Sequence, residues 1–409
     1  MKTLEMLKSR GLVHQITDEK SLSAAFDQGP VTFYIGFDPT ADSLHVGSLK
    51  GIMVAAHLQR MGHVPVMLVG GGTGLIGDPS GKSKDRNILS SEILKHNESC
   101  IGLQLQKFVN TNNPEGFFLN NADWLKSLNY LEFLRDVGVY FRVNEMVKND
   151  TYRLKLDSGE GLSFVEFNYQ LLQAYDFKYL FEKYNCSLQI GGSDQWGNIT
   201  AGTDLVRRSN GANVFGLTIP LAQTSDGKKM GKTESGAVWL DANKTTPYDF
   251  YQFWINCTDE DVFNFLKVYT FMSVSDIDSL PRVSHVDLKK AKETLAYIVT
   301  EIVHGDKLAD EAKAKSNSLF SEDGDKHDLA IQVGVSRSDA ESKTIVSVLS
   351  EADSSVSKSE LRRLITSNAV KADGLVLKSD VSLDELFPSG QDKILITVGK
   401  KKFFSVKLI

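Results

Sequence analysis

Two short motifs, far apart in the chain, combine residue types that suit the binding of phosphate groups. The first, PTADSLHVGS at residues 39–48, directly follows an apolar run at 31–37, and the second, KKMGKT at 228–233, follows an apolar run at 217–221. The first offers a histidine and backbone amides at the start of a helix, and the second offers ammonium groups on a polar loop. This combination stabilises negative charge that develops on phosphoryl oxygens, without a covalent nucleophile. We therefore interpret the two motifs as two halves of one ATP site.

The surroundings of His45 give this residue its functional weight. A strand, a Pro-Thr turn and a helix over 47–60 place His45 at the carboxyl end of a strand, where open α/β sheets bind ligands. Its neutral N–H and the Thr40 hydroxyl can donate to phosphate oxygens, and Gly47 lets a base or ribose approach the backbone. A lone histidine is more often a cap or a core residue, and a lone lysine motif is more often a solvated loop. The prediction therefore depends on the pairing of the two motifs.

A third polar group is expected on one helix face. Tyr169, Gln173 and Asp176 are spaced by four and three residues, so they share a face. An ordinary amphipathic helix is one reading, and the polar wall of a pocket that holds an ammonium or a hydroxyl is the other. Further candidate residues lie at or near strand ends: Asp38, Asp78, Gln189, Gly192, Asp194 and Gln195.

Two glycine-rich matches are rejected. GTGLIG at 72–77 fits a dinucleotide fingerprint, but DPSG follows it, and that fingerprint must open a helix. The segment at 77–83 is one residue short of a P-loop. Both are better explained by glycines that permit close backbone approach near a ligand.

The elements that must position these residues alternate in type. Strand-like runs at 31–37, 64–69, 116–119, 187–190 and 217–221 alternate with helical stretches, which predicts an α/β fold with a Rossmann-like, mostly parallel sheet. Helical periodicity dominates from 247 to about 315. A helix at 357–367, a turn at 372–374 and strands at 393–398 and 403–408 predict a small α+β domain at the end. The expected domains are residues 1–222, 223–325 and 343–409, with a linker over 326–342.

Composition is that of an ordinary globular protein. The chain has 409 residues, 41% hydrophobic and 24% charged, with a net charge of −6, which gives no global signal for nucleic acid. Cys100, Cys186 and Cys257 are isolated, so neither a disulfide framework nor a metal site is expected. There is no apolar signal core and no run of about 20 apolar residues, so we expect a cytoplasmic protein without a membrane span.

The order of these motifs resembles that of class I aminoacyl-tRNA synthetases, and most closely the bacterial-type tyrosyl-tRNA synthetase family. The matching segments are YIGFDPT with Tyr34, the Tyr-x-x-x-Gln-x-x-Asp pattern from Tyr169 to Asp176, GGSDQ at 191–195, and the lysine loop. The last segment resembles a small RNA-binding domain shared with a ribosomal small-subunit protein. The resemblance covers essentially the whole chain.

This resemblance implies an activity. The family activates L-tyrosine with ATP, which carries Mg²⁺ without a dedicated protein site, and transfers the tyrosyl group to the terminal adenosine of tRNA(Tyr). It also implies a homodimer, for which the apolar helix 128–137 is either an interface or buried core. Two departures stand out, because Ser48 replaces a usual His and Gly231 replaces a usual Ser.

The resemblance also assigns residues. For the phenol of tyrosine it implies Tyr34 and Asp176, and for the rest of the amino acid Asp78, Tyr169, Gln173, Gln189 and Gln195. For ATP it implies Gly36, Asp38, Pro39, Thr40, His45, Gly47, Ser48, Gly192, Asp194, Met230 and Lys232. For catalysis at the phosphates it implies Thr40, His45, Ser48, Lys82, Arg86, Lys229, Lys232 and Thr233. For RNA it implies Lys358, Arg362 and Arg363.

Three alternatives stay open from the residues alone. A tryptophan-activating relative shares the motifs, but Tyr34 with Asp176 favours a phenol. A nucleotidyltransferase shares the histidine motif, but the RNA-binding tail argues against it. A non-catalytic RNA-binding relative has no use for a complete amino acid pocket.

Overall fold

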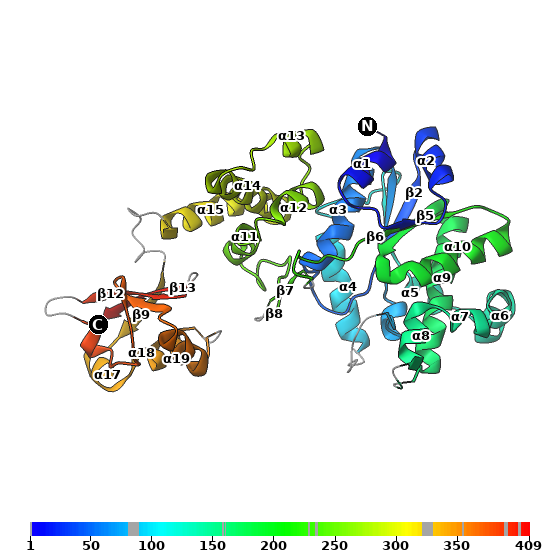
Figure 1. The fold of residues 1–409 in the computed structure, drawn as a ribbon. Helices are drawn as coiled ribbons and strands as arrows, with labels where there is room; N and C mark the ends of the chain where they lie inside the picture. Colours follow the sequence, from blue (N-terminus) through cyan, green and yellow to red (C-terminus); the bar gives the residue numbers. More distant parts are fainter. Residues whose placement is uncertain are drawn as a thin grey trace. The chain divides into compact units, whose positions relative to one another are not determined.

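The chain folds into two units, residues 1–306 and 307–409. The structure, a computed structural model, describes residues 2–80, 90–157, 159, 161–227, 230–233, 236–320, 330–353, 356–387, 392–399 and 402–409. Figure 1 shows the ribbon with its element labels.

A six-stranded sheet forms the centre of the first unit. Its order is β1-β6-β5-β2-β3-β4, and every neighbouring pair is parallel except β1 with β6. The strands are β1 (Gln15–Ile16), β2 (Thr32–Phe37), β3 (Val64–Val69), β4 (Phe117–Asn120), β5 (Cys186–Gly192) and β6 (Phe215–Ile219). The predicted α/β class and the five predicted strands are confirmed. The two-residue β1 was not predicted, because so short a strand has no periodicity of its own.

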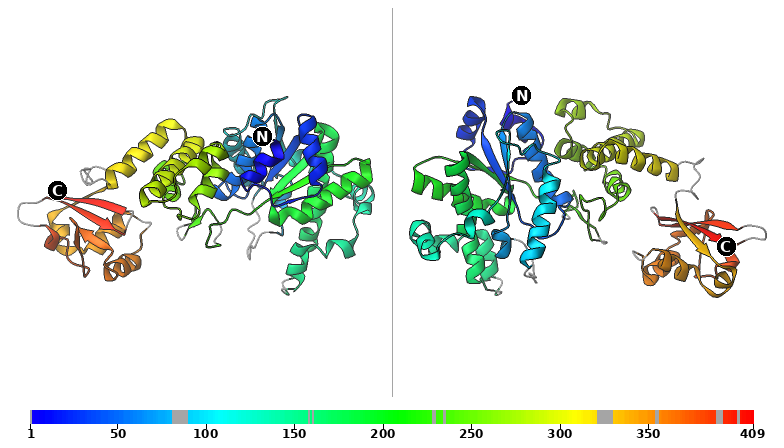
Figure 2. Two further views of the ribbon diagram at one scale, coloured as in Figure 1. Left: turned by 45° about the horizontal axis from the view of Figure 1, so that its top comes forward. Right: turned by 180° about the vertical axis from the view of Figure 1, so that it is seen from behind.

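Helices cover both faces of this sheet (Figures 1 and 2). On one side lie α3 (Val46–Arg60) and α4 (Ser91–Leu105), and on the other lie α9 (Phe164–Tyr184) and α10 (Trp196–Asn210). α9 begins with a capping box between Ser163 and Glu166, and it ends at Asn185, which has the left-handed backbone that Asn tolerates. The remaining helices of this part are α1 (Thr3–Ser9), α2 (Glu19–Gln28), α5 (Ala122–Leu125), α6 (Tyr130–Asp136), α7 (Val143–Met146) and α8 (Asp150–Asp157).

A helical region completes the first unit. A short hairpin of β7 (Lys232–Thr233) and β8 (Gly236–Ala237) leads into α11 (Pro247–Ile255), α12 (Val262–Tyr269), α13 (Val274–Ser279) and α14 (His285–His304). The predicted boundary at 222/223 does not separate two units here. One physical reason is Arg10, a buried residue of the first segment whose guanidinium donates to the carbonyl oxygens of Lys267, Thr270 and Met272.

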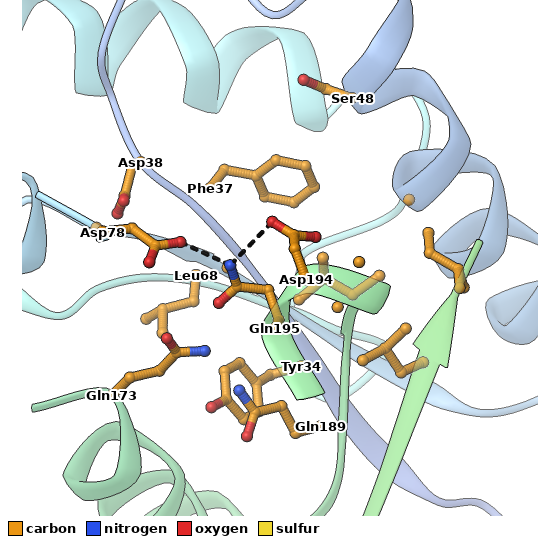
Figure 3. A pocket seen from close by; sticks show the side chains of 18 of the residues that line it. Tyr34, Phe37, Asp38, Ser48, Leu68, Asp78, Gln173, Gln189, Asp194 and Gln195 are labelled. Carbon is orange, nitrogen blue, oxygen red and sulfur yellow. Dashed lines mark hydrogen bonds between the residues drawn. The ribbon is translucent and has the colours of Figure 1, made fainter. Parts of the chain in front are cut away.

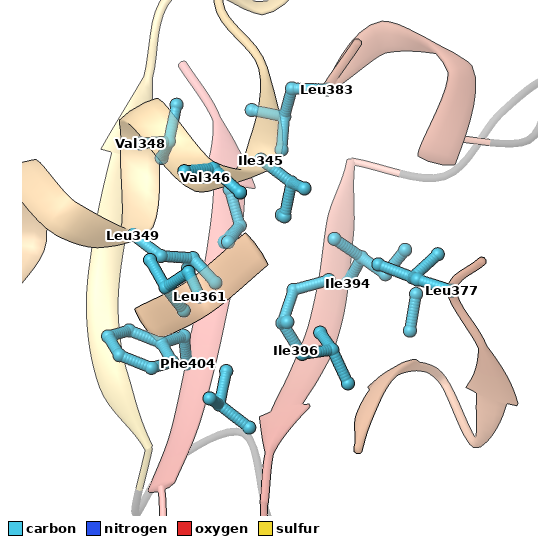
Figure 4. Close-up of a cluster of buried hydrophobic side chains, with 14 of the residues drawn as sticks. Ile345, Val346, Val348, Leu349, Leu361, Leu377, Leu383, Ile394, Ile396 and Phe404 are labelled. Carbon is cyan, nitrogen blue, oxygen red and sulfur yellow. The ribbon is translucent and has the colours of Figure 1, made fainter. Parts of the chain in front are cut away.

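The second unit contains a five-stranded sheet with the order β11-β10-β12-β13-β9. Its elements are α15 (Asp306–Phe320), β9 (Ile331–Val335), α17 (Arg337–Ser342), α18 (Ile345–Ala352), α19 (Lys358–Thr366), β10 (Val370–Ala372), β11 (Leu375–Val376), β12 (Lys393–Val398) and β13 (Lys402–Leu408). Leu349, Leu361, Ile396 and Phe404 belong to the core between its helices and its sheet (Figure 4). The helix, turn and two strands predicted from the sequence all form.

The structure differs from the predicted linker over 326–342. β9 lies within that range and pairs in parallel with β13, and α17 follows it with Ser336 as its N-cap. The sequence IQVGV is short, and its hydrogen bonds are made to β13, which follows about 70 residues later in the sequence. Its role in the sheet therefore depends on a long-range pairing that local pattern does not show.

No helix in the described part of the chain is long and apolar enough to cross a membrane.

Candidate active site

A cavity of about 320 Å³ opens at the carboxyl ends of β2, β5 and β6 and beside the start of α3. The order of the strands along the chain reverses at this position, because β3 and β4 extend the sheet on one side of β2, and β5 and β6 extend it on the other. Open parallel sheets usually bind their ligands at such a point. Figure 3 shows Tyr34, Gln173 and Gln189 at one end of the view and Ser48 at the other. The predicted residues that line the cavity are Tyr34, Gly36, Asp38, Gly47, Ser48, Asp78, Tyr169, Gln173, Asp176, Gln189, Gly192, Asp194 and Gln195.

The two opening motifs meet beside this cavity. The backbone N–H of Val46 donates to Val238 O at 3.0 Å, and that of Leu240 donates to Leu44 O at 2.8 Å, so His45 and Trp239 form a β-bridge. Val238 N–H in turn donates to Gly231 O of the lysine motif at 2.9 Å. The segment that follows the lysine motif therefore ties that motif to the N-terminus of α3, which agrees with one site built from two motifs.

His45 is held as the N-cap of α3. Its Nδ1 accepts from the Gly47 N–H at 2.9 Å, so the neutral ring carries its proton on Nε2. A Cβ at Gly47 would lie 2.6 Å from Cε1 of His45, so glycine is required for this ring position. The cap thus fixes the tautomer that presents an N–H donor, as the sequence analysis required.

Met230 is a buried anchor and does not line the cavity. Its backbone N–H donates to Ala222 O at 2.8 Å, and its sulfur accepts from the Tyr269 hydroxyl at 3.2 Å. It therefore holds the start of the lysine loop against the helical region. Pro39, Thr40 and His45 also lie outside the cavity lining.

Several predicted residues are not described. Lys82, Arg86 and Lys229 lie outside the described residues. Lys232 and Thr233 make up the two-residue strand β7, of which the structure describes the backbone but not the side chains.

Asp176 forms a buried acidic floor at one end of the cavity. It is 2% exposed, and its two carboxylate oxygens accept from Trp124 Nε1 at 2.7 Å and Asn121 Nδ2 at 2.9 Å. Burial raises the pKa of Asp176 to about 7, against the opposing effect of the two hydrogen bonds. One further hydrogen-bond donor would therefore stabilise the ionised form of the Asp176 carboxyl group.

Asn121 and Trp124 were missed by the sequence analysis. They follow β4, an edge strand, and the sheet order brings them to α9. The only signal was the polar pair of residues 120 and 121 at a strand end, which resembles an ordinary turn.

The Tyr34 hydroxyl is a buried donor without a partner among the described residues. Tyr34 is 2% exposed, and the negative charge of Asp176 contributes to the raised pKa of its hydroxyl, after burial itself. Gln173 and Gln189 each have a buried Oε1 that also lacks a partner in the described structure. Unpaired buried polar atoms cost free energy, so their convergence on one cavity indicates a polar ligand.

A second polar network lies nearer the strand ends. The Tyr169 hydroxyl donates to Asp38 at 3.3 Å, and the Thr73 hydroxyl donates to the same carboxylate at 3.1 Å. Gln195 Nε2 donates to Asp78 at 2.6 Å and to Asp194 at 3.3 Å (Figure 3). These contacts orient three carboxylates around the cavity, where they can accept from an ammonium or from hydroxyl groups.

Comparisons with known proteins identify the family of this chain. Residues 27–321 match the family model described as tRNA synthetases class I (W and Y). The chain belongs to this family. It is 44% identical to a tyrosine--tRNA ligase of Fusobacterium nucleatum subsp. nucleatum over 98% of this chain and 97% of that one. It is 42% identical to a tyrosine--tRNA ligase of Acetivibrio thermocellus over 99% of both chains.

Solved structures of aminoacyl-tRNA synthetases share the fold of this chain. A C-terminally truncated mitochondrial tyrosyl-tRNA synthetase of Aspergillus nidulans matches with a TM-score of 0.70 and 32% identity, over 78% of this chain and 94% of that one. A tryptophanyl-tRNA synthetase of Encephalitozoon cuniculi, at 13% identity and a TM-score of 0.55, shares the fold. Fold alone therefore does not separate the two amino acids, and the pocket must do so.

Proposed function

We propose that this protein is a tyrosine--tRNA ligase, which joins L-tyrosine to ATP as tyrosyl-adenylate and then transfers the tyrosyl group to tRNA(Tyr). The observation that carries the choice of tyrosine is that the Tyr34 hydroxyl, which has no partner among the described residues, and the buried Asp176 carboxylate line the same cavity. A phenol hydroxyl can donate to Asp176 and accept from Tyr34. Phenylalanine offers neither interaction, so it leaves the buried Tyr34 hydroxyl without a partner among the described residues and gives Asp176 no donor beyond Trp124 and Asn121.

The remaining carboxylates suit the amino acid end of the substrate. The tyrosine ammonium is assigned to Asp78, Tyr169 and Gln173, and the ribose hydroxyls to Asp194 beside Gly192. The tyrosine carboxylate attacks the α-phosphorus, and pyrophosphate leaves. His45 Nε2–H, Lys229, Lys232 and Thr233 are assigned to the negative charge that develops on the phosphates. Mg²⁺ enters as the complex of ATP and belongs to the substrate.

The tryptophan-activating function is the second candidate, since the family model covers both amino acids. ATP–pyrophosphate exchange with each amino acid separates the two. We expect exchange with tyrosine alone. Exchange driven by tryptophan would overturn the assignment of the pocket, and no exchange with any amino acid would overturn the function.

The second unit is proposed to bind tRNA. Lys358, Arg362 and Arg363 are exposed on α19, while Leu361 and Ile365 of the same helix face the core. This leaves a basic face available for phosphate contacts. Its assignment to RNA follows from the resemblance of this segment to a small RNA-binding domain.

We also propose a homodimer and a cytoplasmic site of action. α6 has two faces, because Phe133 is buried while Leu131 is 75% exposed. Val139, Val143 and Phe164, which follow in sequence, are also more than 60% exposed. A second copy of the chain would cover these exposed apolar side chains. Sedimentation of Leu131→Asp tests this: a monomer is expected, and an unchanged dimer would remove this face from the interface.

A further inference from the structure

Lys50 is a buried cation on the wall of the ATP cavity, and no role described above involves it. It is the fifth residue of α3 and only 8% exposed. It lines the cavity together with Gly47 and Ser48 of the same helix and with residues 219–222, which follow β6. Among the residues that the structure describes, it is the one Lys, Arg or His on that lining.

Nothing described in the protein neutralises this charge. The Lys50 side chain makes no hydrogen bond and no ion pair with any described residue. A structural lysine normally reaches water or pairs with a carboxylate, because an unpaired buried ammonium is costly. The dipole of α3 does not offset this cost, since Lys50 lies near the N-terminal end, which is the positive end.

Burial also lowers the affinity of the Lys50 amine for its proton. Desolvation lowers the pKa of Lys50 to about 8, so the ammonium form is retained at neutral pH but at a cost in free energy. An anion bound in the cavity removes that cost. A negatively charged ligand in the cavity would therefore stabilise the Lys50 ammonium.

We propose that Lys50 is an ATP-binding residue whose ammonium neutralises negative charge of the nucleotide in the cavity. The proposal rests on the assignment of this cavity to ATP. The carboxylates on the lining, which are those of Asp38, Asp78, Asp176 and Asp194, repel a polyphosphate, and the other titratable groups there are the neutral tyrosines Tyr34 and Tyr169. Lys50 therefore gives the nucleotide the one described cationic side chain on this lining, on the α3 side of the cavity.

The test is direct binding of ATP and of tyrosine to Lys50→Met, which keeps the unbranched stem and removes the charge. We expect the Kd for ATP to rise at least about tenfold, while the Kd for tyrosine changes by less than about twofold. Lys50→Arg should recover part of the ATP affinity. The matched control is Lys20→Met, on the exposed surface of α2, which should leave both constants unchanged.

Two further arms separate the possible failures. Adenosine lacks the phosphates, so its inhibition of exchange should change by less than about threefold in Lys50→Met. An equal loss for adenosine and ATP, an unchanged ATP Kd, or an equal loss of tyrosine and ATP would each overturn the proposal. Failure of the proposed function would be seen separately, as absence of tyrosine-dependent exchange in the unmodified protein.

Discussion

The hydrogen bond from Trp124 to Asp176 gives a prediction whose size follows from the structure. Trp124→Phe removes the indole N–H that donates to the carboxylate at 2.7 Å but keeps an aromatic ring against Tyr179, on which Trp124 stacks at 4.3 Å. The other donor, Asn121, is a less clean target because its Oδ1 also accepts from the Gly72 N–H. Trp124→Phe therefore changes chiefly the proton affinity of Asp176.

The magnitude depends on how much the bond lowers the pKa of Asp176. A hydrogen bond to a charged group contributes about 1.5–3 kcal/mol, which corresponds to about one to two pKa units. The pKa is about 7 with both donors present, so the variant should titrate near pH 8–9. At pH 7 the ionised fraction then falls from about one half to about 1–10%.

Tyrosine affinity should follow this fraction, because the phenol donates to the ionised carboxylate. The ionised form is populated above the pKa, so affinity rises with pH and levels off above it. At pH 7 the variant should bind tyrosine about 5- to 50-fold more weakly than the unmodified protein, and at pH 9 by less than about twofold. The ratio of the two proteins removes the titration of tyrosine itself.

Calorimetric titration of tyrosine between pH 6 and pH 9 measures this ratio. Tyr179→Leu is the control, because it removes the stacking partner and leaves the donor in place, and its effect should not vary with pH. A loss in Trp124→Phe that is equal at every pH would refute the reasoning. It would show that the indole acts through packing and not through the charge of Asp176.

Three other changes test separate parts of the site. Gly47→Ala should displace the His45 ring and break the cap of α3, which lowers the free energy of unfolding by about 1 kcal/mol and slows adenylate formation. Thermal melting measures the first effect and ATP–pyrophosphate exchange the second, and unchanged values of both would contradict the role of His45 as the cap. Lys232→Ala should lower the adenylation rate by about tenfold or more with tyrosine affinity unchanged, because its contact is expected mainly in the transition state; equal losses in binding and rate in stopped-flow experiments would argue against that role. Removal of residues 321–409, which contain the entire five-stranded sheet, should spare exchange and weaken charging of tRNA; full charging by the shortened protein would remove RNA binding from that unit.

The sequence predicted most of the polar side chains around the cavity because their signals are local. Asp38 and Asp194 each follow a strand, and parallel strands bring their carboxyl ends to one edge of a sheet. Tyr169 and Asp176 share a face through helical periodicity alone. These inferences needed the type of each element and not its neighbours.

The residues that were missed depend on neighbours. Trp124 reaches Asp176 only because β4 lies at the edge of the sheet beside β3. Lys50 resembles a solvent-facing residue in sequence, yet α3 is buried over nearly its whole circumference, so the lysine has only the cavity to face. A helix with apolar residues on every side was the one local signal for it.

The charges around the cavity explain how two unlike substrates are aligned in the proposed reaction. Tyrosine brings an ammonium, and the carboxylate of Asp78 attracts it, while the carboxylates on the lining together repel a polyphosphate. ATP brings negative charge, which is attracted by three groups at the start of α3. These groups are the positive end of the helix dipole, the His45 N–H and the Lys50 ammonium. The tyrosine carboxylate is repelled by the acids that hold its own ammonium, so it is directed toward the α-phosphorus. Electrostatic separation within one small cavity therefore orients the two substrates before any bond is formed.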